Sequence, residues 1–175
     1  MRTDLVFTLT GTDRVGLVEE VTGVLLAVGG NVETSRMARL GGEFAMLVLV
    51  SLPAEQIAAA QTALSHLTEE GHRVSFVETQ PDAASVLAGW LPYRVSVHGA
   101  DHEGIVHEIA RGLSSRGITI ESMETGVSAA PVSGLTLFDM TALVLVPPAV
   151  DSTRWVDALV QAGHDANVDV EIEPA

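Results

Sequence analysis

Two short segments of the sequence carry the residue types that could recognise a small charged ligand. The first reads GTDRVGLV over 11–18 and the second reads GADHEGIV over 99–106. Each leads into a stretch with helical spacing, and the free backbone N–H groups at a helix N-terminus favour an anion. Asp13 and Asp101 could pair with an ammonium group at the same place. The residue types therefore favour noncovalent binding of a ligand that carries both charges.

The candidate contacts in these segments are the glycines, the aspartates and the residues beside them. They are Gly11, Asp13, Arg14, Gly16 and Leu17 in the first segment, and Asp101, His102, Gly104 and Ile105 in the second. Gly16 and Gly104 would let a ligand approach the backbone closely. The aspartates have a second interpretation, because each lies where a helix N-cap is expected and a capping aspartate needs no ligand. Arg14 could bind a carboxylate bidentately or be a solvated surface charge.

The composition excludes several kinds of chemistry. All nine residues counted as Lys or Arg are arginine, and there is no cysteine. The chain therefore has no Schiff-base or P-loop lysine, no disulfide, no thiolate metal site and no thiol nucleophile. We predict no cofactor. The formal net charge is −14, so we expect no direct binding to nucleic acid, because phosphate neutralisation supplies most of that affinity.

Histidines and acids in and around the second segment raise the question of a metal site. The cluster comprises His98, Asp101, His102, Glu103, His107 and Glu108. His102 and His107 are five residues apart and do not share a helix face, and no known ligand spacing is present. We interpret the cluster as a surface turn rich in titratable groups and predict no metal site; the alternative is a metal-dependent enzyme. Because the sequence lacks G-x-S-x-G, H-E-x-x-H and any other nucleophile–base pattern, we predict that the protein is not an enzyme.

The two segments lie in two copies of one repeated unit. The glycine and aspartate positions of the first segment recur 88 residues later, from Gly11 to Gly99 and from Asp13 to Asp101. Further along, the apolar block that begins at Phe44 recurs 94 residues later, at Phe138. The second copy has therefore gained six residues, and we place this insertion within the segment 128–134, because an insertion between blocks in register belongs in a loop.

Each copy predicts the order strand, helix, strand, strand, helix, strand. Alternation at Leu5, Phe7 and Leu9 predicts a first strand with one core face, and an apolar stripe over 17–28 predicts an amphipathic helix. The glycine pair 41–42 predicts a hairpin between the second and third strands. This order is typical of the ferredoxin-like unit. We therefore predict an α+β fold with two antiparallel sheets, each with its helices on one face.

The repeat also divides the chain. We predict a first domain over 1–79, a linker over 80–92 and a second domain over 93–175. The first residues do not have the pattern of a signal peptide, and no apolar stretch approaches the roughly 18 residues of a membrane span. We expect a soluble, cytoplasmic protein with no membrane association. Units of this size leave a sheet face and edge strands to be covered, which pairing between copies would do.

The residues resemble the ACT domain, a regulatory module that binds small molecules, usually amino acids. The resemblance rests on the turn segment 11–18 and on GGNV over 29–32. Two such units in tandem, with SRMARLGGEFAM over 35–46 and PVSGLTLFDM over 131–140, resemble the glycine cleavage system transcriptional repressor group. The resemblance covers nearly the whole chain. It implies ligand contact by Asn31 and, at the equivalent position of the second copy, by Thr119.

The resemblance implies a non-catalytic regulator. Such a protein would bind a small amino acid, with glycine as a candidate, at interfaces between ACT units. Binding would change its contact with a DNA-binding transcription regulator, its protein partner, and the chain would form a homodimer. The alternative is an amino-acid-sensing regulatory subunit of a metabolic enzyme. Val15 and Glu103 stand where the family often has proline, and the family's histidine and asparagine are absent from both turns, so the ligand's identity stays open.

Overall fold

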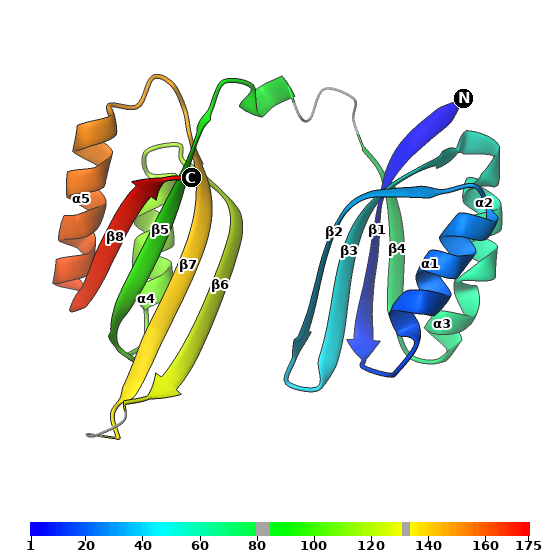
Figure 1. Ribbon diagram of the computed structural model, residues 1–175, viewed down its shortest axis with the longest axis horizontal. Helices are drawn as coiled ribbons and strands as arrows, with labels where there is room; N and C mark the ends of the chain where they lie inside the picture. Colours follow the sequence, from blue (N-terminus) through cyan, green and yellow to red (C-terminus); the bar gives the residue numbers. More distant parts are fainter. Residues whose placement is uncertain (80–84, 131–133) are drawn as a thin grey trace. The chain divides into compact units, whose positions relative to one another are not determined.

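The computed structural model describes residues 1–79, 85–130 and 134–175. The chain divides into two compact units, Met1–Ala83 and Ala84–Ala175. Each unit has one four-stranded antiparallel sheet with its helices on one face (Figure 1). The predicted α+β fold of two ferredoxin-like units is confirmed.

The first unit follows the predicted order, with its sheet ordered β2-β3-β1-β4. Its elements are β1 (Arg2–Thr12), α1 (Leu17–Ala27), β2 (Asn31–Leu40), β3 (Glu43–Pro53), the 3-10 turn η1 (Ala54–Gln56), α2 (Ile57–Ala63), α3 (Ser65–Glu69) and β4 (Arg73–Glu78). Leu5, Phe7 and Leu9 of β1 are buried against the helices, as their alternation predicts. Val21 and Leu25 of α1 complete this core.

The second unit repeats the first, with its sheet ordered β6-β7-β5-β8. Its elements are the 3-10 turn η2 (Ser85–Leu87), β5 (Leu91–Ala100), α4 (Ile105–Ser114), β6 (Thr119–Ala129), β7 (Thr136–Val146), α5 (Ser152–Asp165) and β8 (Val168–Pro174). Val95 and Val97 of β5 pack with Ile109 of α4 and Trp155 of α5 in a separate core. Asp151 caps α5 by accepting hydrogen bonds from two backbone N–H groups.

The second helical region of the first unit differs from the single helix that the sequence predicts. It is broken at Leu64 into α2 and α3. Ser65 Oγ donates to the Thr62 carbonyl oxygen, and His66 Nδ1 lies 2.9 Å from the Ala63 carbonyl oxygen. These side chains occupy acceptors that a continuous helix would use, so the Leu67 N–H bonds to Leu64 instead.

The hairpins lie where the repeat places them. Gly41 and Gly42 join β2 to β3, and both have positive φ, as a tight two-residue turn requires. The predicted insertion over 128–134 coincides with the end of the β6–β7 hairpin, and its residues 131–133 lie outside the described residues. Of the predicted linker, residues 80–84 also lie outside them, while η2 and the first two residues of β5 fall inside that range.

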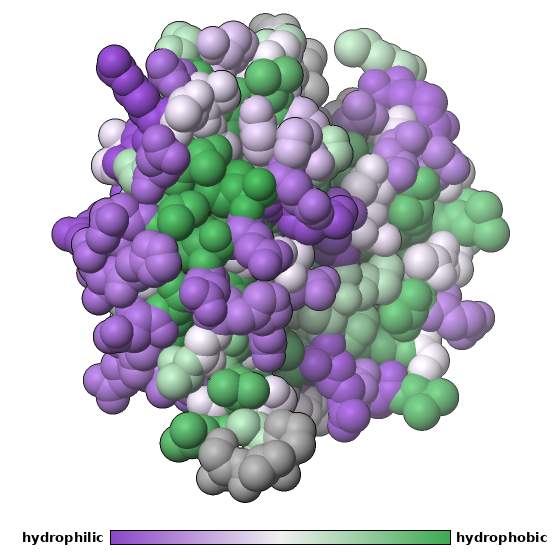
Figure 2. Space-filling view, turned by 60° about the vertical axis from the view of Figure 1, so that its left-hand side comes forward, coloured by the Kyte–Doolittle hydropathy of each residue, from purple (hydrophilic) through white to green (hydrophobic). Residues whose placement is uncertain are grey.

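On the face that Figure 2 shows, groups of hydrophobic residues lie among hydrophilic ones. No helix in the described part of the chain is long and apolar enough to cross a membrane.

Candidate functional site

The turn after the first strand of each unit leads into a helix through a glycine in the left-handed conformation. Gly16 has φ 91° before α1, and Gly104 has φ 97° before α4. These glycines are the N-caps, and neither helix start is capped by a side chain of the described residues. The interpretation of Asp13 and Asp101 as N-caps is therefore wrong. They precede the true cap by three residues, because the turn needs a left-handed residue immediately before the helix.

The two aspartates are held differently, although their backbones agree. The Asp13 N–H donates to the Gly42 carbonyl at 3.2 Å, and the Asp101 N–H donates to the Thr136 carbonyl at 2.9 Å. Each turn is thus tied to the hairpin of its own sheet. The Asp13 carboxylate also forms an ion pair with Arg39, whose Nε lies 2.9 Å from Asp13 Oδ2. Asp101 forms no ion pair within the described ranges, so its carboxylate is the more available of the two.

Gly11 and its counterpart Gly99 are required by packing. A Cβ at Gly11 would lie 2.6 Å from His72 Cδ2, and one at Gly99 would lie 2.7 Å from Val168 Cγ1. His72 is buried, and its two ring nitrogens face the carbonyl oxygens of Leu67 and Thr12 at 3.3 and 3.2 Å. The close approach of the residue before β4 in the first unit, and of the first residue of β8 in the second, thus explains both glycines without a ligand.

Arg14 is engaged inside the first unit. Its Nη2 donates to Glu20 at 2.7 Å and to Glu70 at 3.0 Å, and these two carboxylates raise the pKa of Arg14. Glu20 also accepts from His66 Nε2 at 2.5 Å. The hydrogen bonds from His66 and Arg14 lower the pKa of Glu20, and the same carboxylate raises the pKa of His66. Arg14 therefore fastens the turn to α1 and to the end of α3.

His102 performs the equivalent fastening in the second unit with backbone acceptors. Its Nδ1 lies 3.0 Å from the Glu103 carbonyl oxygen and its Nε2 lies 2.6 Å from the Ala166 carbonyl oxygen. Only the doubly protonated ring can donate to both. These two carbonyls raise the pKa of His102. Ala166 follows α5, so this turn too is tied to the end of the second helix.

The remaining predicted contacts either have side chains in the cores or lie far from the turns. Leu17 and Ile105 are each 2% exposed, and their side chains belong to the cores. The Asn31 side chain donates to Glu33 at 2.7 Å, and Asn31 pairs with Ser51 of β3. The end of β1, where the turn begins, pairs with Glu43 at the other end of β3. Eight residues of strand separate these two rungs, about 27 Å at the usual rise. One small ligand therefore cannot touch Asn31 and the turn of the same unit.

Thr119 has the same relation to the second turn. It begins β6, at the other end of α4 from Gly104. The ten residues of α4 correspond to about 15 Å. Thr119 borders a hollow of about 440 Å³ with Arg111 and Ile120 among its lining residues. A second hollow of about 430 Å³ lies at the start of α4, where His102, Gly104 and Ile105 meet. The structure thus gathers three predicted contacts of the second unit, but not Thr119 with them.

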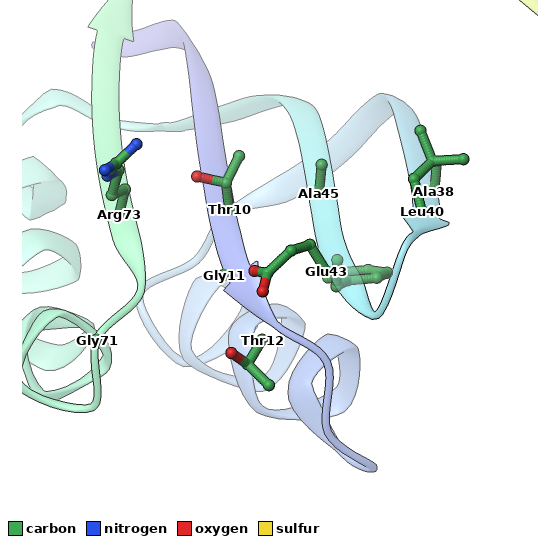
Figure 3. Close-up of a pocket in the computed structure, with 10 residues that line it drawn as sticks. Thr10, Gly11, Thr12, Ala38, Leu40, Glu43, Ala45, Gly71 and Arg73 are labelled. Atoms are coloured by element: carbon green, nitrogen blue, oxygen red, sulfur yellow. The ribbon is translucent and has the colours of Figure 1, made fainter.

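A hollow that sequence reasoning missed lies on the sheet of the first unit. It has a volume of about 560 Å³ and includes only Gly11 among the predicted contacts. Figure 3 shows Arg73, Thr10, Ala45 and Ala38 across the four strands, with the Glu43 carboxylate beside Gly11. The hollow forms because Thr10, Ala45 and Ala38 have small side chains. Strand alternation predicts that these residues lie on the exposed face of the sheet. Only the pairing register of the four strands shows that they lie side by side across it.

The histidine and acid cluster of the second unit is dispersed. His98 lies on the sheet and its Nδ1 is 2.5 Å from Asp139, while His102 faces backbone carbonyls. Within 1–79, 85–130 and 134–175, no three His, Asp or Glu side chains form a group that could hold a metal ion.

Comparisons with known proteins agree with this architecture. Residues 3–76 match the ACT domain family model. A 47-residue stretch is 45% identical to the glycine cleavage system transcriptional repressor of Escherichia coli K12, covering 27% of this chain and 25% of that repressor. The chain thus spans about a quarter of the length of this curated relative.

Two solved structures are similar over the full length. A protein of unknown function from Galdieria sulphuraria is 35% identical, with a TM-score of 0.85 over 100% of this chain and 99% of that one. A candidate glycine cleavage system transcriptional repressor is 23% identical, with a TM-score of 0.69 over 99% and 97%, and shows the shared fold. The first unit therefore matches the ACT domain family model over nearly its whole length, and the second unit repeats the topology of the first.

Proposed function

We propose that this chain is a non-catalytic regulatory protein that senses a small amino acid, with glycine as the first candidate. The observation that carries the proposal is the turn into α4. It presents an uncapped helix N-terminus beside Asp101, whose carboxylate has no ion pair with a described residue. An amino acid carries the two charges that this arrangement can receive. The ACT domain match and the repressor relative support a regulatory role.

In this proposal the ligand carboxylate lies at the start of α4. The backbone N–H groups of Val106 and His107 have no partner among the described residues and point out of the first turn. The ligand ammonium pairs with Asp101. The turn of the first unit is the weaker site, because Arg39 already neutralises Asp13 and Arg14 is committed to two carboxylates.

A complete site needs residues from more than one unit. Asn31 and Thr119 lie too far from the turn of their own unit to share its ligand. They can contribute only at the turn of a different unit, and in this proposal a second copy of the chain supplies that turn, so the active form is a homodimer. The proposal keeps the domains at 1–79 and 93–175 with a linker between them, and places the protein in the cytoplasm.

Titration calorimetry with a panel of amino acids tests the proposal. The full-length chain should bind glycine or another small amino acid. Asp101→Ala should weaken that binding by about ten- to a hundredfold, the range expected from losing one charged hydrogen bond. The matched variant Asp13→Ala should leave the affinity unchanged. If a folded chain binds no amino acid in the panel, the sensor proposal is wrong.

We further propose that the signal passes to a DNA-binding transcription regulator by protein contact. The acidic chain is unsuited to bind DNA itself, so repression would act through a basic partner. The amino acid can control that contact only if its affinity differs between the free and the partner-bound chain. Recovery of a DNA-binding protein with the tagged chain, in an amount that changes when the amino acid is added, supports this step. Recovery of a metabolic enzyme instead contradicts it.

A further inference from the structure

Each sheet has one face that its own helices leave open, and these two open faces differ in chemistry. Paired residues of neighbouring antiparallel strands share a face, so the register identifies the members. The first open face has the rows Val77–Val6–Leu49–Thr34, Ser75–Thr8–Leu47–Arg36 and Arg73–Thr10–Ala45–Ala38. The second has the rows Glu173–Arg94–Leu143–Ser122, Glu171–Ser96–Thr141–Glu124 and Asp169–His98–Asp139–Gly126.

The first open face is apolar and carries unpaired positive charge. Leu47 is 47% exposed and Val77 is 58% exposed, although both lie in the sheet. The small residues of the third row form the hollow of Figure 3. Arg36 and Arg73 lie at opposite edges of the face, and neither forms an ion pair with a described residue. Exposed apolar area of this kind on a sheet is typical of an interaction surface.

The second open face is acidic. It carries five carboxylates, and two of them have a partner: Glu173 pairs with Arg94, and Asp139 lies against His98. Glu124, Asp169 and Glu171 remain, with no ion pair in the described part of the chain. None of the large apolar residues that are strongly exposed lies in the three rows of this face.

The charge is reversed at equivalent positions of the two faces. Arg36 pairs with Leu47, and Glu124 pairs with Thr141, the equivalent residue of the second unit. Arg36 and Glu124 are 88 residues apart, the offset of the repeat. Arg73 pairs with Thr10, and Asp169 pairs with the equivalent residue, His98. The two arginines of the first face thus stand where the second face has carboxylates.

We propose that the open face of the first sheet binds the open face of the second sheet of another copy of this chain. The apolar centre of the first face needs a cover, and a second copy of a chain with a net charge of −14 can approach closely only where positive charge meets negative. Arg36 and Arg73 supply that charge, and the acidic face complements it. Two copies that exchange these contacts satisfy both faces twice and close as a two-fold dimer. The inference does not rest on amino-acid binding, because it uses neither turn.

Light scattering and sedimentation measure the outcome. The wild-type chain should be a dimer, and Arg36→Glu with Arg73→Glu should halve the mass. Adding Glu124→Arg and Asp169→Arg to that variant reverses both faces and should restore the dimer. Arg111→Glu with Arg154→Glu is the matched control, because it makes the same change in net charge on exposed helix positions and should leave the mass unchanged.

The result is decisive in each case. A wild-type chain that stays monomeric at all concentrations overturns the proposal, and so does a dimer that survives the double reversal on the first face. If the variant with two substitutions is monomeric but its circular dichroism has changed, the variant with four substitutions decides. A native spectrum and a dimer in that variant support charge pairing, and a monomer or an altered spectrum contradicts it. Amino-acid binding measured on the same samples reports separately on the sensor proposal.

Discussion

The turns that follow β1 and β5 have the same backbone but different fastenings. Both place a left-handed glycine before the helix and both tie the turn to the hairpin by one backbone hydrogen bond. The first is then held by charged side chains, through Arg14 and Asp13. The second is held by backbone acceptors around His102, and its aspartate is left without an ion pair among the described residues. The comparison separates what the turn needs from what it can vary.

What the turn needs is the absence of a side chain at two places. At Gly11 and Gly99 the start of the last strand, or the residue before it, occupies the space of a Cβ, and at Gly16 and Gly104 the φ angle excludes most side chains. What it can vary is the fastening. A unit whose acid is already neutralised is a poor receptor for an ammonium group, so the difference favours the second turn for ligand recognition.

The largest expected effect comes from filling the close approaches. Gly11→Ala and Gly99→Ala should each lower the free energy of unfolding by about 1–3 kcal/mol, the usual cost of overpacking. Urea unfolding followed by circular dichroism measures both units. Fluorescence of Trp155, which is buried in the second core, should report the effect of Gly99→Ala more strongly than that of Gly11→Ala.

Gly23→Ala is the control for these variants. Gly23 lies in α1 with open space around it and no positive φ, so alanine should stabilise by about 0.5–1 kcal/mol. Equal destabilisation by all three substitutions would contradict the packing explanation.

The next effect comes from the left-handed glycines. Gly16→Ala and Gly104→Ala meet no atom within 4 Å, so only the backbone conformation opposes them. We expect a loss of about 1–2 kcal/mol in each, the cost of a left-handed alanine. The same urea titrations measure it. Equal losses in the two units would show that both turns require a left-handed residue before the helix. A loss in one unit alone would contradict that shared requirement.

These glycines also show how far the sequence leads. Strand alternation and the helical stripe are local patterns, and for that reason the residue types alone assign Leu5, Phe7 and Val21 to the core. The repeat likewise predicts the two-unit organisation. The sequence predicts the helix start three residues too early, because an aspartate is the commoner cap and the conformation of Gly16 does not follow from its residue type.

The candidate site was less predictable than the fold. Spacing located both turns, but the partners of their side chains lie far along the chain, such as Glu70 for Arg14 and Arg39 for Asp13. No local pattern connects such pairs. The separation of Asn31 from its own turn likewise follows from the strand register and not from the motif.

A smaller effect should distinguish the two aspartates in the absence of ligand. Asp13→Ala removes an exposed ion pair with Arg39, which is worth at most about 1 kcal/mol. Asp101→Ala removes no ion pair of the described structure, only a weaker Coulombic attraction to His102, and should lower the stability less than Asp13→Ala. Thermal unfolding of the two variants measures the difference. A larger loss for Asp101→Ala would reveal a further interaction of that carboxylate within the chain, and would weaken its assignment to the ligand.

The smallest effect is a difference in how the two histidines respond to pH and salt. The pKa of His66 is raised above the ordinary 6.5 by the Glu20 carboxylate, and the pKa of His102 is raised by two backbone carbonyls. A raised pKa in the folded chain means that protonation stabilises the fold. The contribution is therefore complete below the unfolded value and is lost as the pH rises through the folded value.

Proton NMR titration of the two rings separates these causes. Added salt screens the exposed charge of Glu20 and should return the pKa of His66 toward its ordinary value. It should change that of His102 less, because carbonyl dipoles hold this ring by short hydrogen bonds. In Glu20→Gln the pKa of His66 should fall while that of His102 stays unchanged. If salt shifts both rings equally, the two turns are fastened by the same kind of interaction, and the contrast between ionic and backbone fastening does not hold.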